Sequence, residues 1–234
     1  MLDYFDFEAI HCDEDNIRKQ MADGKSFLFA AQPHGVLSYT GMCSAVYNPQ
    51  DCLNVPTAAA SVVLQTPLLK NLMGIFNLVD ASAHNISKIF KNGGCVAIYI
   101  GGIAELFKCC QEEERLYLAN RKGFIKLALR QGVDVVPVYL FGNTSVLSVL
   151  KHGPLAALSR KLQASLTLFW GKWFLPIPRD EKVSALIDTS SCTSLIYAQL
   201  TFTMDGTYTK QIKCINSLGG SYFMLLGNQL ACLT

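Results

Sequence analysis

Short apolar runs alternate with helical patterns along this chain, and this alternation limits it to a layered α/β fold. Residues 25–31, 95–100 and 133–141 form compact apolar runs, and each is followed by a loop that contains glycine. Such runs are typical of strands buried on both faces of a parallel sheet. Residues 78–80 predict a further short strand. We therefore expect a single layered domain with a central, mostly parallel sheet flanked by helices.

Apolar residues at helical spacing predict the elements between these strands. We expect helices at 36–47, 67–76, 121–130 and 145–169, together with one that follows an N-cap at Ser82 and ends near Asn92. Asn120 is the expected cap of the helix at 121–130, and Gly132 its stop. Pro137 lacks a backbone donor, which argues for an edge position or a bulge in strand 133–141. Residues 53–64 favour neither element, and 175–179 should be extended.

Composition divides the chain into three parts. Residues 1–24 form an acidic arm, residues 25–185 carry the strand and helix alternation, and residues 186–234 have few charges and no clear period. The acidic N-terminus lacks the basic and apolar segments of a secretory signal, so none is expected. Nine cysteines without a CxxC pair indicate neither a zinc ribbon nor a complete disulfide framework, and favour a reducing, cytosol-facing location.

The chain is unusually hydrophobic, with 50% hydrophobic and 16% charged residues. Residues 27–69 contain a single charged side chain, Asp51, but four prolines interrupt them, at positions 33, 49, 56 and 67. A membrane-spanning helix needs about 20 continuous apolar residues with every backbone group satisfied internally. We therefore expect a buried core or a surface that rests on a membrane.

Positive charge is concentrated between residues 115 and 179, which hold ten basic residues against one acid, Asp134. Such an excess suggests an anionic partner, such as a phosphate-bearing cofactor or lipid headgroups, although a solvated basic face is an equally ordinary explanation. Lys122, Lys126 and Arg130 should share the outer face of one helix. No nucleic-acid partner is expected, because aromatic residues are not interleaved with these charges.

Three predicted strands end in loops that carry chemically useful side chains. These loops are QPHG at 32–35, GGIAE at 101–105 and FGN at 141–143, and parallel strands would bring His34, Glu105 and Asn143 to one edge. A histidine with a pKa near 6.5 can accept a proton from a hydroxyl, and a carboxylate on its other ring nitrogen would set the tautomer. From residue types alone, a structural histidine remains the alternative.

Glycines and basic residues near these loops suit substrate binding. Gly35, Gly101 and Gly102 would let the backbone approach a substrate, and N–H groups at the start of helix 36–47 could stabilise an oxyanion. Arg121 and Lys122 at a helix start could hold phosphates. The GxSxG, GxGxxG and P-loop motifs are absent, and the four histidines are too scattered to indicate a metal site. The expected nucleophile is therefore the substrate's own hydroxyl.

Three sequence strings together resemble the type 2 diacylglycerol acyltransferase family, which includes monoacylglycerol and wax-ester acyltransferases. They are QPHG at 32–35, IGGIAE at 100–105 and NRKGFIKLALRQGVDVVPVYLFGN at 120–143, within a similarity that covers residues 27–183 and includes LPIP at 175–178. The resemblance implies an acyltransferase-like fold that moves an acyl group from acyl-CoA, a co-substrate, to an acylglycerol or long-chain alcohol, with no bound cofactor. It implies His34 as the base, Glu105 as its partner, and a substrate-binding set of Gln32, Pro33, Gly35, Gly101, Gly102, Arg121, Lys122 and Asn143. The segment at 121–124 would lie on the CoA side.

The same resemblance implies a cytosol-facing site at the endoplasmic reticulum membrane, with the lipid-droplet surface as the alternative, and leaves a homo- or hetero-oligomer open. The sequence departs from the family in three places. Gln32 replaces the first histidine of the family's HPHG motif, the N-terminal hydrophobic hairpin is not recognised, and neither is a closing strand and helix after Val183. These departures support a second hypothesis, a catalytically weak or inactive relative that binds lipid or regulates an active homologue.

Overall fold

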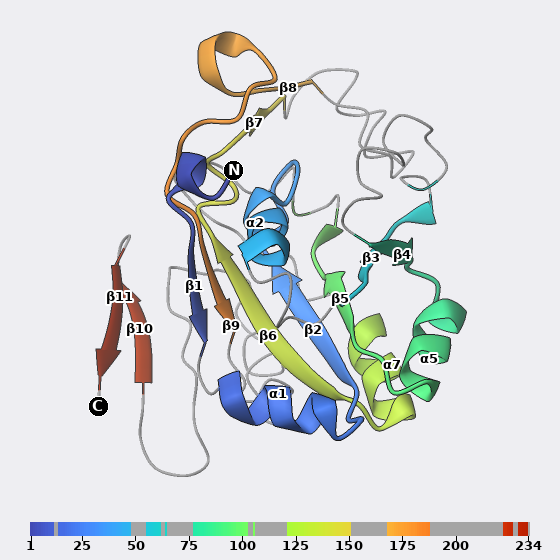
Figure 1. Ribbon diagram of the computed structural model, residues 1–234. Coiled ribbons are helices and arrows are strands. Elements are labelled where there is room, and N and C mark those ends of the chain that lie inside the picture. Colours follow the sequence, from blue (N-terminus) through green and yellow to red (C-terminus); the bar gives the residue numbers. More distant parts are fainter. Residues whose placement is uncertain are drawn as a thin grey trace.

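The computed structural model describes residues 1–11, 14–47, 55–61, 64, 77–102, 105, 121–150, 168–187, 222–226 and 229–233. Within these ranges the main feature is a seven-stranded sheet with the strand order β1-β9-β6-β2-β5-β3-β4 (Figure 1). The strands are β1 (Glu8–His11), β2 (Phe27–Gln32), β3 (Thr57–Ala59), β4 (Leu78–Asp80), β5 (Val96–Tyr99), β6 (Asp134–Phe141) and β9 (Ser184–Ile187).

The centre of this sheet is parallel. Strands β6, β2, β5, β3 and β4 run in one direction, while β9 is antiparallel to β6 and β1 is parallel to β9. The helices are α1 (Glu14–Ala22), α2 (Tyr39–Tyr47), α5 (Ala83–Lys91) and α7 (Gly123–Gln131), with short 3₁₀ turns at η1 (Asp3–Phe5) and η3 (Lys172–Phe174). The predicted α/β architecture, a mostly parallel sheet with helices, is therefore confirmed.

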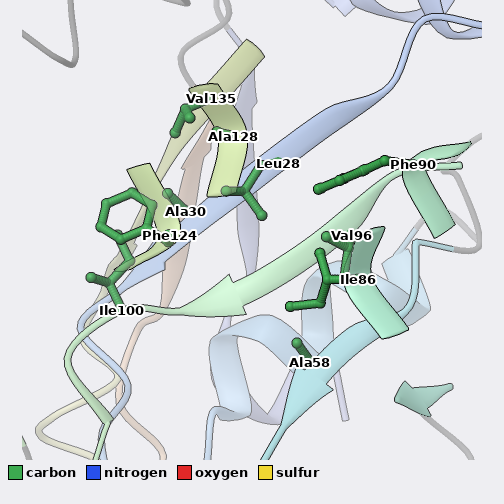
Figure 2. Packing of buried hydrophobic residues seen from close by; sticks show 10 residues of the cluster. All are labelled: Leu28, Ala30, Ala58, Ile86, Phe90, Val96, Ile100, Phe124, Ala128 and Val135. Carbon is green, nitrogen blue, oxygen red and sulfur yellow. The ribbon is translucent and has the colours of Figure 1, made fainter. Parts of the chain in front are cut away.

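Both faces of the central strand β2 are buried, because successive side chains of a strand point to opposite faces. On one face, Leu28 and Ala30 lie in a cluster with side chains from α5 and α7 (Figure 2). On the other face, Phe27 and Phe29 pack with Ile17 of α1. Figure 1 shows α1 near the amino ends of the central strands and α2 near their carboxyl ends. This double cover explains the continuous apolar sequence of β2.

The helix boundaries follow the predicted signals in part. Ser82 caps α5 by accepting a hydrogen bond from the Asn85 backbone N–H over 3.4 Å, and Gly132 ends α7 with a φ of 63°. The prediction that Asn120 caps α7 is wrong, because the helix begins at Gly123 with Lys122 in the N-cap position. Asn120 itself lies outside the described residues.

The predicted orientation of α7 is confirmed. Phe124 and Ala128 are buried, whereas Lys122, Lys126 and Arg130 are exposed on the opposite side of the helix. A helix buries one stripe of its surface and leaves the rest to solvent, so the two groups separate at helical spacing.

Pro137 does not place β6 at the edge of the sheet, as its missing donor had suggested. β6 lies between β2 and β9, and its pairing with β9 within the described residues runs from Val138 to Phe141. Pro137 therefore has a paired neighbour on the β2 side and precedes the point at which β9 begins to pair. Among the residues that the structure describes, the pairing of β6 with β9 starts after Pro137, so the missing donor of this proline removes no hydrogen bond of that pairing.

The helix predicted for 145–169 is wrong where it can be compared with the structure. At its two ends the chain forms antiparallel strands β7 (Ser148–Val149) and β8 (Phe169–Trp170), and the Leu150 N–H donates to the Leu168 carbonyl over 2.9 Å. Aromatic and β-branched residues favour strands over helices, which explains the difference. Residues 151–167, like the helix predicted at 67–76, lie outside the described residues.

The two ends of the chain contribute strands that the sequence did not reveal. A strand does follow Val183: β9 enters the main sheet between β1 and β6. The acidic segment 1–24 supplies β1, whose Glu8 pairs with Ser184. Near the other end, β10 (Tyr222–Leu226) and β11 (Gln229–Leu233) pair with each other in a separate antiparallel sheet. The division at 24 and 185 stays a prediction.

Candidate functional site

The loop after β2 is tied to the end of β6 by the side chain of Asn143. The Asn143 side chain is 1% exposed, and its Nδ2 donates to the backbone carbonyl oxygens of Pro33 at 3.0 Å and His34 at 2.6 Å. Its Oδ1 accepts from the Thr40 backbone N–H at 3.3 Å. One buried amide therefore connects β6, the QPHG loop and the start of α2. Its predicted role in binding substrate stays a prediction.

The His34 ring is held by its Nδ1 atom, which lies 2.6 Å from the carbonyl oxygen of Gly35. A carbonyl can only accept, so this contact assigns the proton of the neutral ring to Nδ1 and leaves the lone pair of Nε2 free to accept a proton. Burial lowers the pKa of His34, and the Gly35 carbonyl acts in the opposite direction. The neutral imidazole, which is the form required of a general base, is thus favoured near pH 7.

Glu105 lies beside His34, as the strand ends predicted, and its side chain is 1% exposed. Its Oε2 accepts from the backbone N–H of His34 over 3.4 Å. The sequence had suggested a carboxylate at the second ring nitrogen, but at Nδ1 the structure places the Gly35 carbonyl instead. Glu105 therefore contacts the histidine loop through its backbone, and the catalytic role of this residue stays a prediction.

Arg121 lies next to the loop that follows β5. Its Nη2 donates to the carbonyl oxygen of Gly101 over 3.4 Å, and a Cβ added to Gly102 would lie 3.8 Å from the same nitrogen. This contact connects the segment before α7 to the loop that follows β5. Lys122 is exposed beside it.

Glycine is required at two positions of these loops. Gly35 has a φ of 64°, in the left-handed region, and an added Cβ would lie 2.7 Å from the Asn143 carbonyl oxygen. At Gly101 an added Cβ would overlap the carboxylate of Glu105. Both glycines thus allow the close contact of neighbouring loops, and their contact with a substrate stays a prediction.

The expectation of free N–H groups at the start of the helix needs correction. The helix α2 begins at Tyr39 rather than at 36, and the N–H groups of Tyr39 and Thr40 already donate to Leu37 O and Asn143 Oδ1. These two amides are consequently engaged within the protein and do not form a free oxyanion site in this structure.

Tyr99 is a member of this cluster that the sequence reasoning missed. Its ring packs edge-to-face on the His34 ring, with centroids 4.8 Å apart and an interplanar angle of 86°. Burial raises the pKa of Tyr99, and the Ser38 hydroxyl partly offsets this. An added Cβ at Gly41 would overlap the Tyr99 hydroxyl, so a small residue is needed there too. The sequence did offer a sign of this role: Tyr99 carries a hydroxyl and stands two residues before Gly101, but the run 95–100 was interpreted as purely apolar.

Gln32 is the last residue of β2 and pairs with Tyr139 of β6. Its Oε1 atom is buried and has no hydrogen-bond partner among the residues that the structure describes. A buried polar atom without a partner costs free energy of about 1–3 kcal/mol. Pro33, which follows it, is fully buried. The position that departs from the family motif is therefore also the one with an unsatisfied polar atom.

The fold and these loops define an α/β protein with a histidine-centred site at the carboxyl ends of neighbouring parallel strands, the usual location of ligand sites in such sheets. A family model for diacylglycerol acyltransferases matches residues 2–176. The chain belongs to the diacylglycerol acyltransferase family.

Relatives of this family are similar to the chain over more than half of its length. The chain is 27% identical over 172 residues to diacylglycerol O-acyltransferase 2 of Dictyostelium discoideum, covering 70% of this chain and 50% of that protein. It is 28% identical over 155 residues to the Danio rerio protein of the same name, covering 62% and 41%. It is 24% identical over 136 residues to acyl-CoA wax alcohol acyltransferase 1 of Mus musculus, covering 55% and 42%. The chain thus spans about half the length, or less, of these relatives.

The described residues show neither a membrane-spanning helix nor a metal site. None of the helices in that part of the chain is both long enough and apolar enough to span a membrane. The same part of the chain holds no group of three or more His, Cys, Asp or Glu side chains placed to bind a metal ion.

Proposed function

We propose that this chain is an acyl-CoA-dependent O-acyltransferase that esterifies the hydroxyl of a mono- or diacylglycerol, or of a long-chain alcohol. The observation that carries the proposal is the contact of His34 Nδ1 with the Gly35 carbonyl, which leaves Nε2 as a proton acceptor. Membership of the family supports the reaction class. We take the α/β sheet to be the acyltransferase fold of that family.

In the proposed reaction His34 Nε2 takes the proton of the acceptor hydroxyl as its oxygen attacks the thioester carbonyl of acyl-CoA. A C–O bond forms, the C–S bond then breaks, and the leaving thiolate recovers the proton from the imidazolium. The proposed reaction requires no oxidant, metal or bound cofactor. Glu105 acts through the His34 backbone N–H, holding the loop in the geometry that the proton transfer requires.

The basic residues before α7 would bind the phosphates of the co-substrate. Arg121 donates to the carbonyl oxygen of Gly101, and Glu105, four residues further on, accepts from the His34 backbone N–H, so we expect a single acyl-CoA to reach both Arg121 and His34. Lys122, Lys126 and Arg130 add an exposed cationic face that continues away from that point. Phosphate groups suit such a site because guanidinium and ammonium groups form charge-assisted hydrogen bonds with them.

We place the reaction at the cytosolic face of the endoplasmic reticulum membrane or at a lipid-droplet surface, because the proposed acceptors are water-insoluble lipids. The lipid acceptor, the membrane and a further copy or homologue of the chain are the partners that this proposal includes.

The test is ester formation from radiolabelled acyl-CoA and mono- or diacylglycerol in microsomes that contain the full chain. His34→Ala should abolish ester formation at unchanged protein level. His84→Ala, at an exposed position of α5, is the matched control and should leave the rate unchanged. Wild-type activity that survives in His34→Ala would exclude the proposed mechanism.

The buried, unpartnered oxygen of Gln32 favours a second candidate, a weak or inactive relative that binds lipid or regulates an active homologue. Restoring the family residue with Gln32→His discriminates between the two. A large gain in ester formation favours a weakened enzyme. A folded variant that remains inactive, while the chain still associates with an active homologue, favours the regulator.

A further inference from the structure

A loop at the end of the sheet that carries the candidate site exposes two aromatic side chains almost completely. Trp173 is 78% exposed and Phe174 is 86% exposed, and the next residue, Leu175, is 49% exposed. The loop is the orange ribbon at the top of Figure 1, joined to β8. Large apolar side chains this exposed and this close together are unusual on a soluble surface and often mark an interaction site.

The backbone of this loop holds the two aromatic side chains outward. Trp173 and Phe174 have φ angles of 52° and 59°, in the left-handed region that bulky residues avoid. The Gly171 N–H donates to Leu175 O at 2.7 Å, and the Lys172 N–H donates to Ile177 O at 2.8 Å. These two bonds close the loop at its base, so the surrounding structure enforces the outward position of the tip.

The base of the loop is anchored to the site end of the molecule. The Tyr4 hydroxyl donates to Pro178 O at 2.7 Å, and the backbone N–H of Arg179 donates to Val146 O at 3.0 Å. Arg179 also donates from Nη1 to the Ser145 carbonyl oxygen at 3.0 Å. Because Ser145 follows Asn143 by two residues, the loop has a defined position relative to the histidine loop.

The cations at the base of the loop are neutralised or engaged within the protein. Lys172 pairs with Asp180 at 2.9 Å and lies over the Tyr4 ring, and Arg179 binds Ser145 and Ser148. The tip therefore presents apolar surface and one indole N–H, without free charge. A tryptophan beside other apolar side chains and without neighbouring free charge is typical of the boundary between water and lipid. There its ring is buried in the lipid and its N–H stays hydrated.

A protein partner is a poorer fit to such a tip. Two aromatic side chains bury about 150–250 Å² each, well short of the roughly 800 Å² per partner of a stable protein interface. A lipid surface has no such requirement, because it adapts to the inserted side chains.

We infer that the loop from Gly171 to Ile177 inserts Trp173 and Phe174 into the interfacial layer of a lipid surface. The inserted loop would turn the carboxyl ends of the central strands, with His34, toward that surface. This inference rests on the part of the proposed function that locates the reaction at a lipid surface, and it assigns the contact to particular residues.

The chain contains two tryptophans, which permits a direct test by fluorescence. The variant Trp170→Phe keeps Trp173 as the reporter, and Trp173→Phe keeps Trp170, which is only partly exposed, as the matched control. Each is mixed with phosphatidylcholine vesicles whose acyl chains do or do not carry bromine. The emission of Trp173 should shift to shorter wavelength when vesicles are added, and brominated acyl chains should quench it. Both effects should be larger for Trp173 than for Trp170.

Vesicle flotation measures the contribution of the tip. Trp173→Ser combined with Phe174→Ser should weaken partition into phosphatidylcholine vesicles about tenfold or more, the loss of apolar burial expected from removing two aromatic groups. Leu129→Ser, at a position of α7 that is 63% exposed, should leave partition unchanged. Salt at about 1 M, which shortens the Debye length to about 3 Å, should have little effect because the tip carries no free charge.

Two results would overturn the inference. One is Trp173 emission that does not respond to vesicles; the other is an emission shift that depends on protein concentration without lipid, which would identify a contact between copies. Vesicle binding needs no turnover, so an inactive His34→Ala variant that still binds vesicles separates failure of the proposed chemistry from failure of this inference. In detergent-dispersed acceptor, the serine variants should retain the wild-type rate.

Discussion

The side-chain Nδ2 of Asn143 lies 2.6 Å from the backbone carbonyl oxygen of His34, so the end of strand β6 holds the loop that follows β2. The two residues are 109 positions apart in the sequence, yet the parallel pairing of β2 and β6 brings their strand ends together. The end of a neighbouring strand therefore fixes the position of the loop that carries the candidate base.

Asn143→Asp should destabilise the protein by about 3 kcal/mol, because a carboxylate would replace a buried donor opposite two carbonyl oxygens. The measurement is the free energy of unfolding from urea titration at pH 7.5. Asn92→Asp, at the exposed end of α5, is the control and should change stability by less than about 1 kcal/mol. Equal stability of the two variants would contradict the positioning role.

Gly101→Ala should reduce ester formation about tenfold or more, because the added methyl group overlaps the Glu105 carboxylate and displaces it from the His34 loop. It should also cost about 1–3 kcal/mol of stability through overpacking. Gly123→Ala is the matched control, since a Cβ there meets nothing within 4 Å. That variant should be at least as stable as wild type, because alanine is the better helix former. Wild-type activity in Gly101→Ala would show that the Glu105 position is irrelevant to the reaction.

Ester formation should stay at its plateau as pH falls from 8 to below the ordinary histidine pKa of about 6.5, because burial lowers the pKa of His34. The rate should decline only when pH falls through that lowered pKa and protonates Nε2. Steady-state rates at saturating substrate give this profile. A decline in the rate whose midpoint lies at or above the ordinary histidine pKa would contradict the burial of the His34 ring.

The lowered pKa of His34 also makes the free energy of unfolding depend on pH. The unfolded chain binds a proton at His34 more readily than the folded chain, so stability is full above the unfolded pKa and falls as pH drops below it. Urea unfolding midpoints at pH 7.5 and 5.5 measure the effect. His34→Gln removes the titrating ring and should lose less stability over this interval than wild type. An equal loss in both proteins would assign the pH dependence to other groups.

The thiol of Cys43 should be almost unreactive in the folded protein. Its side chain is 0% exposed, and burial raises its pKa to about 11, so at pH 8 the thiolate is only about one thousandth of the population. Alkylation with iodoacetamide followed by peptide mass spectrometry should label Cys43 far more slowly in native protein than in urea. Rapid labelling in the native state would show that Cys43 of α2 is not buried against Phe5 and Val146.

The sequence by itself determined the strands that are buried on both faces and the loops that follow them. The β2, β5 and β6 segments were predictable because continuous apolar runs of this length have few alternatives to a central parallel strand. The same reasoning placed His34, Glu105 and Asn143 at one edge, since parallel strands end together. The Ser82 cap and the Gly132 stop were also predictable, because each depends on local backbone chemistry.

Only the tertiary structure decided how those loops contact one another. The Gly35 carbonyl at Nδ1, the Asn143 amide on the loop backbone and the Tyr99 ring against His34 depend on side-chain directions that periodicity does not report. Strand β9, and the interior position of the strand β6 that contains Pro137, depend on pairing between distant segments. A short strand gains its stability from its neighbours rather than from its own sequence, and so these features appear only when the chain is folded.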